Sequence, residues 1–238
     1  EAFLVKFTSC VSLNPNVSTS ATLCEGAPIN LSVNITGTAT PAYSWAGPNS
    51  YTASVQNPSI SNASTVHIGV YTVTVNNAGC IETATTQVSN VYTTPTVSVN
   101  NGSICSGNSF TIVPSGSITY TIQGGNFVVS PNTSSSYTIT GSSSEGCLSA
   151  NTATSSIVVN PLPAITVTAT SLTICLGESI VLMASGATSY TWSPIALSSS
   201  VIVSPSISTV YSVTGQDAIG CENATTFTLN VDACIGLS

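Results

Sequence analysis

Apolar and polar residues alternate along most of this chain in short runs such as INLSVNI, YTVTV and ESIVLMA. Alternation with a period of two is typical of a strand that buries one face and exposes the other. Gly, Pro and Asn separate the runs, and the residues inside them are rich in Val, Ile, Thr and Tyr. The pattern therefore predicts an all-β protein built from many short strands.

Three segments of the chain repeat the same order of features. Each repeat opens with an apolar residue, Cys, any residue and Gly, continues through two Tyr-containing strands, and closes with Gly-Cys before a last alternating strand. The openings are LCEG at 23–26, ICSG at 104–107 and ICLG at 174–177. The closing cysteines are Cys80, Cys147 and Cys221. Repetition at this scale predicts three modules of one type, each a small β-sandwich.

The module boundaries are expected near residues 94 and 162, where prolines precede the first strands of the second and third repeats. The predicted organisation is an N-terminal extension at 1–20, modules at 21–93, 94–162 and 163–233, and a tail at 234–238. The first repeat carries extra length in AGPNSYTASVQNPSISNAS. This length predicts longer loops or an added edge strand.

The phrases SWAGPNSYTASVQNPSISNAS, HIGVYTVTVNNAGC and GQDAIGC resemble the immunoglobulin-like and PKD-like repeats of secreted Bacteroidota surface proteins. The ending NVDACIGLS is similar to the stretch that precedes the sorting domain of type IX secretion cargo. The resemblance implies three tandem immunoglobulin-like modules on a secreted protein. Such repeats are spacers or binding modules in adhesins, surface filaments and exported enzymes.

Six cysteines recur at matching positions in the three repeats, so a structural role is favoured over a redox role. We expect the bonds Cys24–Cys80, Cys105–Cys147 and Cys175–Cys221, each inside one module. Closing loops of this size stabilises a small module by about 4 kcal/mol in the chain-entropy model. Disulfides also indicate an oxidising, extracellular compartment.

Charge and reactive groups are scarce: the chain has one Lys, no Arg, eight acidic residues and one His, with a net charge of −7. Because almost no cationic groups are available to neutralise phosphates, nucleic acid and anionic membranes are poor partners. His67 has no acidic neighbour in sequence, no G-x-S-x-G motif is present, and the acidic residues are scattered. We therefore expect no enzyme activity, cofactor, metal site or membrane insertion.

Repeated aromatic residues are expected in the cores and not on a sugar-stacking surface. They comprise Trp45, Trp192, Tyr43, Tyr190, Tyr71, Tyr137 and Tyr211. The second repeat has Ile122 where the others have Trp, which predicts a smaller core.

Two cysteines, Cys10 and Cys234, lie outside the repeats. The first follows an apolar segment that contains Phe3, Leu4, Val5 and Phe7. We expect residues 2–9 to insert as a strand into another copy, the alternative being an ordinary first strand of module one. We expect Cys10 of one copy to bond Cys234 of the next, with pairing inside one chain as the alternative.

These features predict a structural subunit of an extracellular filament or cell-surface fibre, a homopolymer assembled head to tail. The alternative function is an adhesin stalk or a carbohydrate-binding or ligand-binding array, with surface glycans as partners. A third interpretation is a non-catalytic spacer in an exported enzyme.

Overall fold

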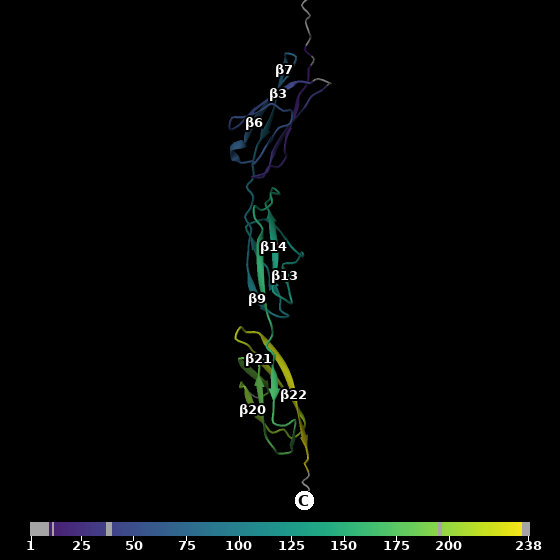
Figure 1. The fold of residues 1–238 in the computed structure, drawn as a ribbon, viewed down its shortest axis with the longest axis vertical. Coiled ribbons are helices and arrows are strands. Elements are labelled where there is room, and N and C mark those ends of the chain that lie inside the picture. The colour runs from purple at the N-terminus through teal and green to yellow at the C-terminus, as the bar shows by residue number, and fades with distance from the viewer. Residues whose placement is uncertain (1–9, 11, 37–39, 195–196, 235–238) are drawn as a thin grey trace, which may run out of the picture. The chain divides into compact units, whose positions relative to one another are not determined.

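A computed structural model describes residues 10, 12–36, 40–194 and 197–234 of the chain. Among these residues, the one helical element is a 3-10 helix at Thr65–His67, and the rest are strands and connections. The strands form seven sheets, which fall into three successive sets along the chain (Figure 1). The fold is all-β, with β-sandwich modules in tandem, as predicted.

The chain divides into two compact units. The first contains the residues up to 98 together with 114–122 and 138–153, and the second contains 99–113, 123–137 and 154–238. The division passes through the second repeat, whose strands are shared between the units.

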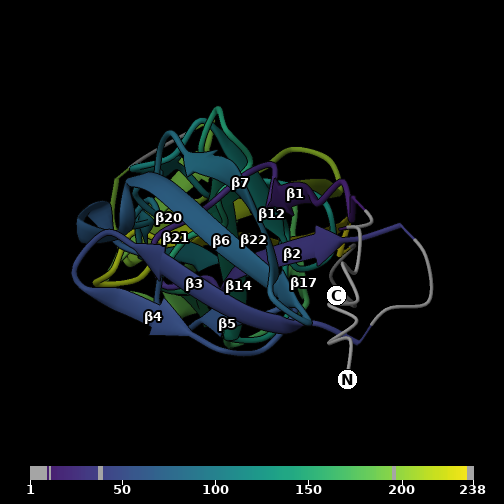
Figure 2. The ribbon, with the colours of Figure 1, turned by 90° about the horizontal axis from the view of Figure 1, so that it is seen from above.

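The first repeat, which lies in the first unit, is a sandwich of two sheets. One sheet has the order β4-β3-β6-β7, and Figure 2 shows these four strands side by side. Its strands are β3 (Ala42–Gly47), β4 (Tyr51–Ala53), β6 (Gly69–Asn77) and β7 (Cys80–Val88). The other sheet is β1-β2-β5, with β1 (Asn16–Thr19), β2 (Ile29–Asn34) and β5 (Ser59–Ile60). Strand β4 lies in the extra length of this repeat at the edge of the sheet, so of the two predicted outcomes the added edge strand is the one observed.

Part of the predicted N-terminal extension belongs to this first sandwich. Strand β1 pairs antiparallel with β2, and the side chain of Leu13 is only 2% exposed within the first core. Residues 16–19 are therefore a strand of the first module. Residues 2–9 lie outside the described part of the chain.

The second repeat has a four-stranded sheet of order β12-β14-β15-β9 and two strand pairs, β8 with β11 and β10 with β13. The four-stranded sheet contains β9 (Gly102–Cys105), β12 (Thr119–Ile122), β14 (Ser135–Ser142) and β15 (Ala153–Asn160). The pairs contain β8 (Ser98–Val99), β10 (Phe110–Thr111), β11 (Pro114–Ser115) and β13 (Val128–Val129). The largest fully buried side chains of this repeat are isoleucines: Ile112, Ile139 and Ile157. No aromatic ring is among them, which agrees with the smaller core predicted from Ile122.

The third repeat, which lies in the second unit, is again a two-sheet sandwich. One sheet is β17-β22-β21-β19, and the other is β16-β18-β20. The strands are β16 (Thr166–Thr168), β17 (Thr173–Cys175), β18 (Ile180–Ser185), β19 (Ser189–Ser193), β20 (Ser200–Val203), β21 (Thr209–Gln216) and β22 (Glu222–Asp232). Buried side chains from both sheets form one apolar cluster, so the two layers share a core.

The aromatic residues occupy the cores of the first and third sandwiches. Trp45, Trp192, Tyr71 and Tyr211 are buried, and each indole N–H donates to a carbonyl oxygen: Trp45 to Val55 at 3.1 Å, Trp192 to Ser198 at 3.0 Å. Tyr43 and Tyr190 are half-buried against the same cores, and Tyr137 is half-buried in the second repeat. The predicted packing role is confirmed for the four buried rings. A buried indole needs such an acceptor because an unpaired N–H is costly.

In every repeat the segment with the opening cysteine runs parallel to the end of the last strand. Strand β9 pairs with the end of β15, β17 pairs with the end of β22, and Cys24 forms a parallel bridge with Tyr92. The residue after the opening cysteine, which is Glu25, Ser106 or Leu176, donates its N–H to the segment that ends the repeat, at 2.7 to 2.9 Å. In the first repeat the acceptor is Tyr92, four residues beyond β7. The opening cysteine therefore lies where the last strand of its repeat ends.

We predict that Gly186→Ala destabilises the fold more than Gly177→Ala. Both glycines have left-handed backbones, with φ of +100° and +90°, so either alanine costs about 1 kcal/mol in conformational strain. A Cβ at Gly186 would also overlap the carbonyl oxygen of Ala164, whereas a Cβ at Gly177 meets nothing within 4 Å. Overpacking adds about 1–3 kcal/mol.

Urea unfolding of the two variants measures this difference in the free energy of unfolding. Gly116 and Gly107 form the equivalent pair in the second repeat, because a Cβ at Gly116 would overlap the carbonyl oxygen of Thr96. Equal losses in both members of a pair would contradict the role assigned to the close approach.

Candidate functional site

Four disulfide bonds use all eight cysteines of the chain. They are Cys10–Cys80, Cys24–Cys147, Cys105–Cys221 and Cys175–Cys234, with Cα–Cα distances of 5.3 to 5.5 Å. All six cysteines of the repeats are bonded, but the three predicted pairings inside modules are wrong. Two of the bonds join neighbouring repeats instead.

The parallel pairing of the last strand explains why pairing within a repeat is impossible. Cys24 lies beside Tyr92, twelve residues beyond Cys80 on the same extended segment. Twelve strand residues span roughly 40 Å at about 3.3 Å each. A disulfide needs Cα atoms within about 7 Å. In the other repeats, the residue beside the opening cysteine is similarly far in sequence from the closing cysteine: Cys105 lies beside Asn160, and Cys175 lies beside Asp232.

The same pairing brings cysteines of successive repeats together. Because the segment that leads to the opening cysteine runs parallel to the last strand, the chain enters a repeat at the end where its last strand begins, next to the closing cysteine. It leaves at the other end, next to the opening cysteine. At each junction the opening cysteine of one repeat thus meets the closing cysteine of the next. Cys24–Cys147 lies within the first unit and Cys105–Cys221 within the second.

The two outer bonds complete this arrangement at the chain's first and last repeats. Cys10 pairs with the closing Cys80, and Cys234 pairs with the opening Cys175, so each takes the place of a cysteine from an adjoining repeat. The predicted bond between Cys10 of one copy and Cys234 of the next is therefore wrong, because both sulfurs are bonded within the chain. Phe3, Leu4, Val5 and Phe7, predicted as intersubunit contacts, lie outside the described residues.

A carboxylate reinforces the first of these outer bonds. The Glu82 side chain, two residues after Cys80, accepts backbone N–H groups from Leu13 at 2.9 Å and Asn14 at 3.1 Å. Hydrogen bonds to an ionised acceptor are stronger than neutral ones. The entering segment is thus attached to the closing turn by a disulfide and a carboxylate clamp.

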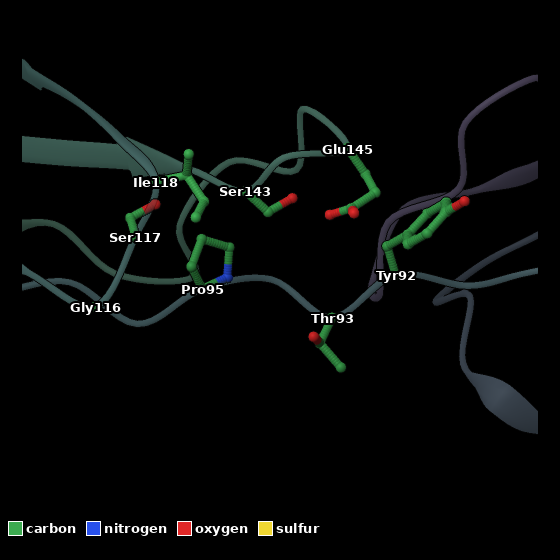
Figure 3. Close-up of a pocket in the computed structure, with 8 residues that line it drawn as sticks. All are labelled: Tyr92, Thr93, Pro95, Gly116, Ser117, Ile118, Ser143 and Glu145. Carbon is green, nitrogen blue, oxygen red and sulfur yellow. The ribbon is translucent and has the colours of Figure 1, made fainter.

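The junction in the first unit holds an open cavity of about 540 Å³. The linker residues Tyr92, Thr93 and Pro95 line it together with two turns of the second repeat (Figure 3). Hydrogen bonds from the Ser144 hydroxyl, from its own backbone N–H and from the Ser143 hydroxyl lower the pKa of the exposed Glu145 carboxyl. The cavity therefore carries a negative charge beside the ring of Tyr92.

The junction in the second unit has a related construction. A cavity of about 460 Å³ adjoins Cys105, the turn that follows it, Leu162 of the linker, and Glu222. An asparagine after the closing cysteine holds the linker at both junctions: Asn151 Nδ2 donates to the Val97 carbonyl at 2.8 Å, and Asn223 Nδ2 to the Pro163 carbonyl at 2.9 Å. Each linker is thus tied to the repeat that it enters.

The remaining ionisable groups are dispersed. His67 Nδ1 accepts the backbone N–H of Ser64 at 3.1 Å, and its carbonyl oxygen accepts the Tyr71 hydroxyl at 3.0 Å, so this histidine closes a short helical turn. Within the described ranges, no three His, Cys, Asp or Glu side chains gather as metal ligands. No helix in the same ranges is long and apolar enough to cross a membrane.

Sequence reasoning found all eight cysteines but missed the clamps made by Glu82, Asn151 and Asn223. These three residues share one property, which is that each lies within four positions after a closing cysteine. Polar side chains that follow a repeated Gly-Cys turn are the sequence feature that could have marked them.

No protein-family model matches the sequence, and comparison with curated proteins found no match. Among solved structures, a three-domain I67–I69 fragment of the titin I-band is similar at 12% identity and a TM-score of 0.40, covering 94% of this chain and 100% of that one. A Ca²⁺-stabilised adhesin of an Antarctic bacterium is similar at 16% identity and a TM-score of 0.39, covering 93% and 75%. A 1.5-MDa bacterial ice-binding adhesin is similar at 17% identity and a TM-score of 0.36, and the match covers 94% of this chain and 99% of that one. Likeness at this level carries no information on function.

We predict that the two outer disulfides are reduced before the two junction disulfides. Cys147 and Cys221 are completely buried, whereas Cys10 and Cys234 are exposed. Thiol–disulfide exchange requires access to a sulfur atom. Timed alkylation of the native protein during mild reduction, followed by mass spectrometry, measures the order. Labelling of Cys24 or Cys105 before Cys10 and Cys234 would contradict the assignment.

Proposed function

We propose that this chain is a non-catalytic structural array of an extracellular surface protein, acting as a stalk whose modules are covalently joined. The observation that carries the proposal is the disulfide bond at each junction between repeats. Tandem modules connected by one linker move relative to each other by default. A second covalent connection beside the linker opposes that motion, which benefits a stalk more than it benefits an independent binding module.

The clamps at the junctions support the same role. The side chains of Asn151 and Asn223 hold the linkers, and buried Cys147 and Cys221 lie where neighbouring repeats meet. Four disulfides support an oxidising, extracellular compartment.

A carbohydrate-binding array remains the alternative, and one feature favours it. Tyr92 lines the cavity in the first unit, where a sugar ring could stack on its face. The tryptophans that would serve best for stacking are buried in the cores. The filament hypothesis depends on strand donation by residues 2–9, which lie outside the described part of the chain, and it stays a prediction.

Sedimentation velocity of the oxidised chain and of a variant lacking residues 2–9, together with a glycan array, separates these functions. A stalk predicts monomers for both proteins and no glycan binding. A filament subunit predicts polymers for the full chain and monomers for the deletion variant. Glycan binding that is lost in Tyr92→Ala but kept in Tyr137→Ala would replace the stalk by a binding array.

A further inference from the structure

We infer that the disulfides form two separate covalent paths for tension between Cys10 and Cys234. In each of the three modules, the segment between the opening and the closing cysteine lies off both paths. Tension along the chain would then be carried without unfolding any module. This goes beyond the structural role proposed above and depends on the disulfide connections alone. A stalk could exist without it.

The first path crosses two disulfides and two short stretches of chain. It passes from Cys10 to Cys80 through their disulfide and follows the backbone from there to Cys105. It then crosses to Cys221 and follows the backbone to Cys234. The backbone stretches contain β7, β8, β9 and β22, which are already extended.

The second path uses the other two disulfides and shares no intermediate residue with the first. It follows the backbone from Cys10 to Cys24 and crosses to Cys147. It continues along the backbone to Cys175 and crosses to Cys234. Its stretches contain β1, β15, β16 and β17.

Each module contributes its first strands to one path and its last strand to the other. The first strands lie on the second path in modules one and three, and on the first path in module two. What remains off both paths is the segment between the opening and closing cysteine of each repeat, 24–80, 105–147 and 175–221. These segments hold most of the buried side chains, including Trp45 and Trp192. Most of the buried side chains therefore lie outside the tensioned stretches, although Val88, Ile157 and Leu229 lie on them.

The two paths are also hydrogen-bonded to each other wherever parallel strands meet. Residues 102–105 of the first path pair with 157–160 of the second, and 230–232 of the first pair with 173–175 of the second. Tyr92 of the first path bridges Cys24 of the second. Pulling parallel strands along their axes loads these bonds together and not one after another, so the pairs share tension between the two paths.

The lengths of the paths set how far the oxidised protein can extend under tension. Fully extended at about 3.4 Å per residue, stretches 80–105 and 221–234 of the first path together span roughly 130 Å. Stretches 10–24 and 147–175 of the second path together span roughly 145 Å. Without disulfides, the chain from Cys10 to Cys234 could extend to roughly 760 Å. Oxidised protein held by its two ends should therefore show no unfolding steps, whereas reduced protein should unfold module by module.

Single-molecule force spectroscopy with handles on the chain ends tests this, and two double-bridge variants provide a matched comparison. One variant replaces Cys10, Cys80, Cys105 and Cys221 by serine, which removes both bridges of the first path and leaves the second intact. The other replaces Cys24, Cys147, Cys105 and Cys221, which removes one bridge from each path. Both variants lose two disulfides and keep two.

The same-path variant should remain inextensible like the oxidised wild type. The shortest covalent route in the cross-path variant follows the backbone from Cys80 to Cys175. Unfolding of the second module should therefore lengthen the protein between its ends by roughly 190 Å, relative to the fully extended first path of the oxidised wild type. Equal extension of the two variants would overturn the inference. The comparison of oxidised with reduced wild type requires no substitution, so it can be made even if a variant fails to fold. Unfolding steps in the oxidised wild type would overturn the inference.

Discussion

In every repeat, the segment at the opening cysteine pairs in parallel with the end of the repeat, and the rest of this structure depends on that constraint. It places the opening cysteine at the end of the last strand and the closing cysteine at the beginning of that strand. The two cysteines of a repeat are thereby separated by the length of the sandwich. A bond within the repeat is excluded, and a bond to the neighbouring repeat is the one that the strand directions permit.

This constraint changes what the disulfides stabilise. A bond within each module would close a much shorter loop, whereas Cys24–Cys147 and Cys105–Cys221 close loops with sequence separations of 123 and 116. In the chain-entropy model such a bond is worth about 5 kcal/mol. The gain over a shorter loop is small, so the larger consequence is geometric: the junctions are fixed as well as the modules. The second repeat, whose largest fully buried side chains are isoleucines, is bonded to both of its neighbours.

Much of the fold followed from the sequence, because alternation and repetition are local properties. The three repeats and the burial of four of the aromatic rings were predicted, and the edge strand at Tyr51–Ala53 was one of two outcomes expected from the extra length of the first repeat. The cysteine pairing was not predicted correctly. An opening and a closing cysteine recur in every repeat, as Cys24 and Cys80 do in the first, but this recurrence says nothing about which ends of the sandwich they occupy. Strand direction between segments far apart in the chain is a tertiary property, and it decided the outcome. Glu82, Asn151 and Asn223 were missed for a related reason, since their acceptors and donors come from distant segments.

Each junction is closed by the opening cysteine of one repeat and the closing cysteine of the next. Proteolysis of the oxidised protein under conditions that prevent disulfide exchange, followed by mass spectrometry of the linked peptides, tests it directly. Peptides containing Cys24 should be linked to peptides containing Cys147, and peptides containing Cys105 to peptides containing Cys221. Linkage of Cys24 to Cys80, or of Cys105 to Cys147, would contradict it.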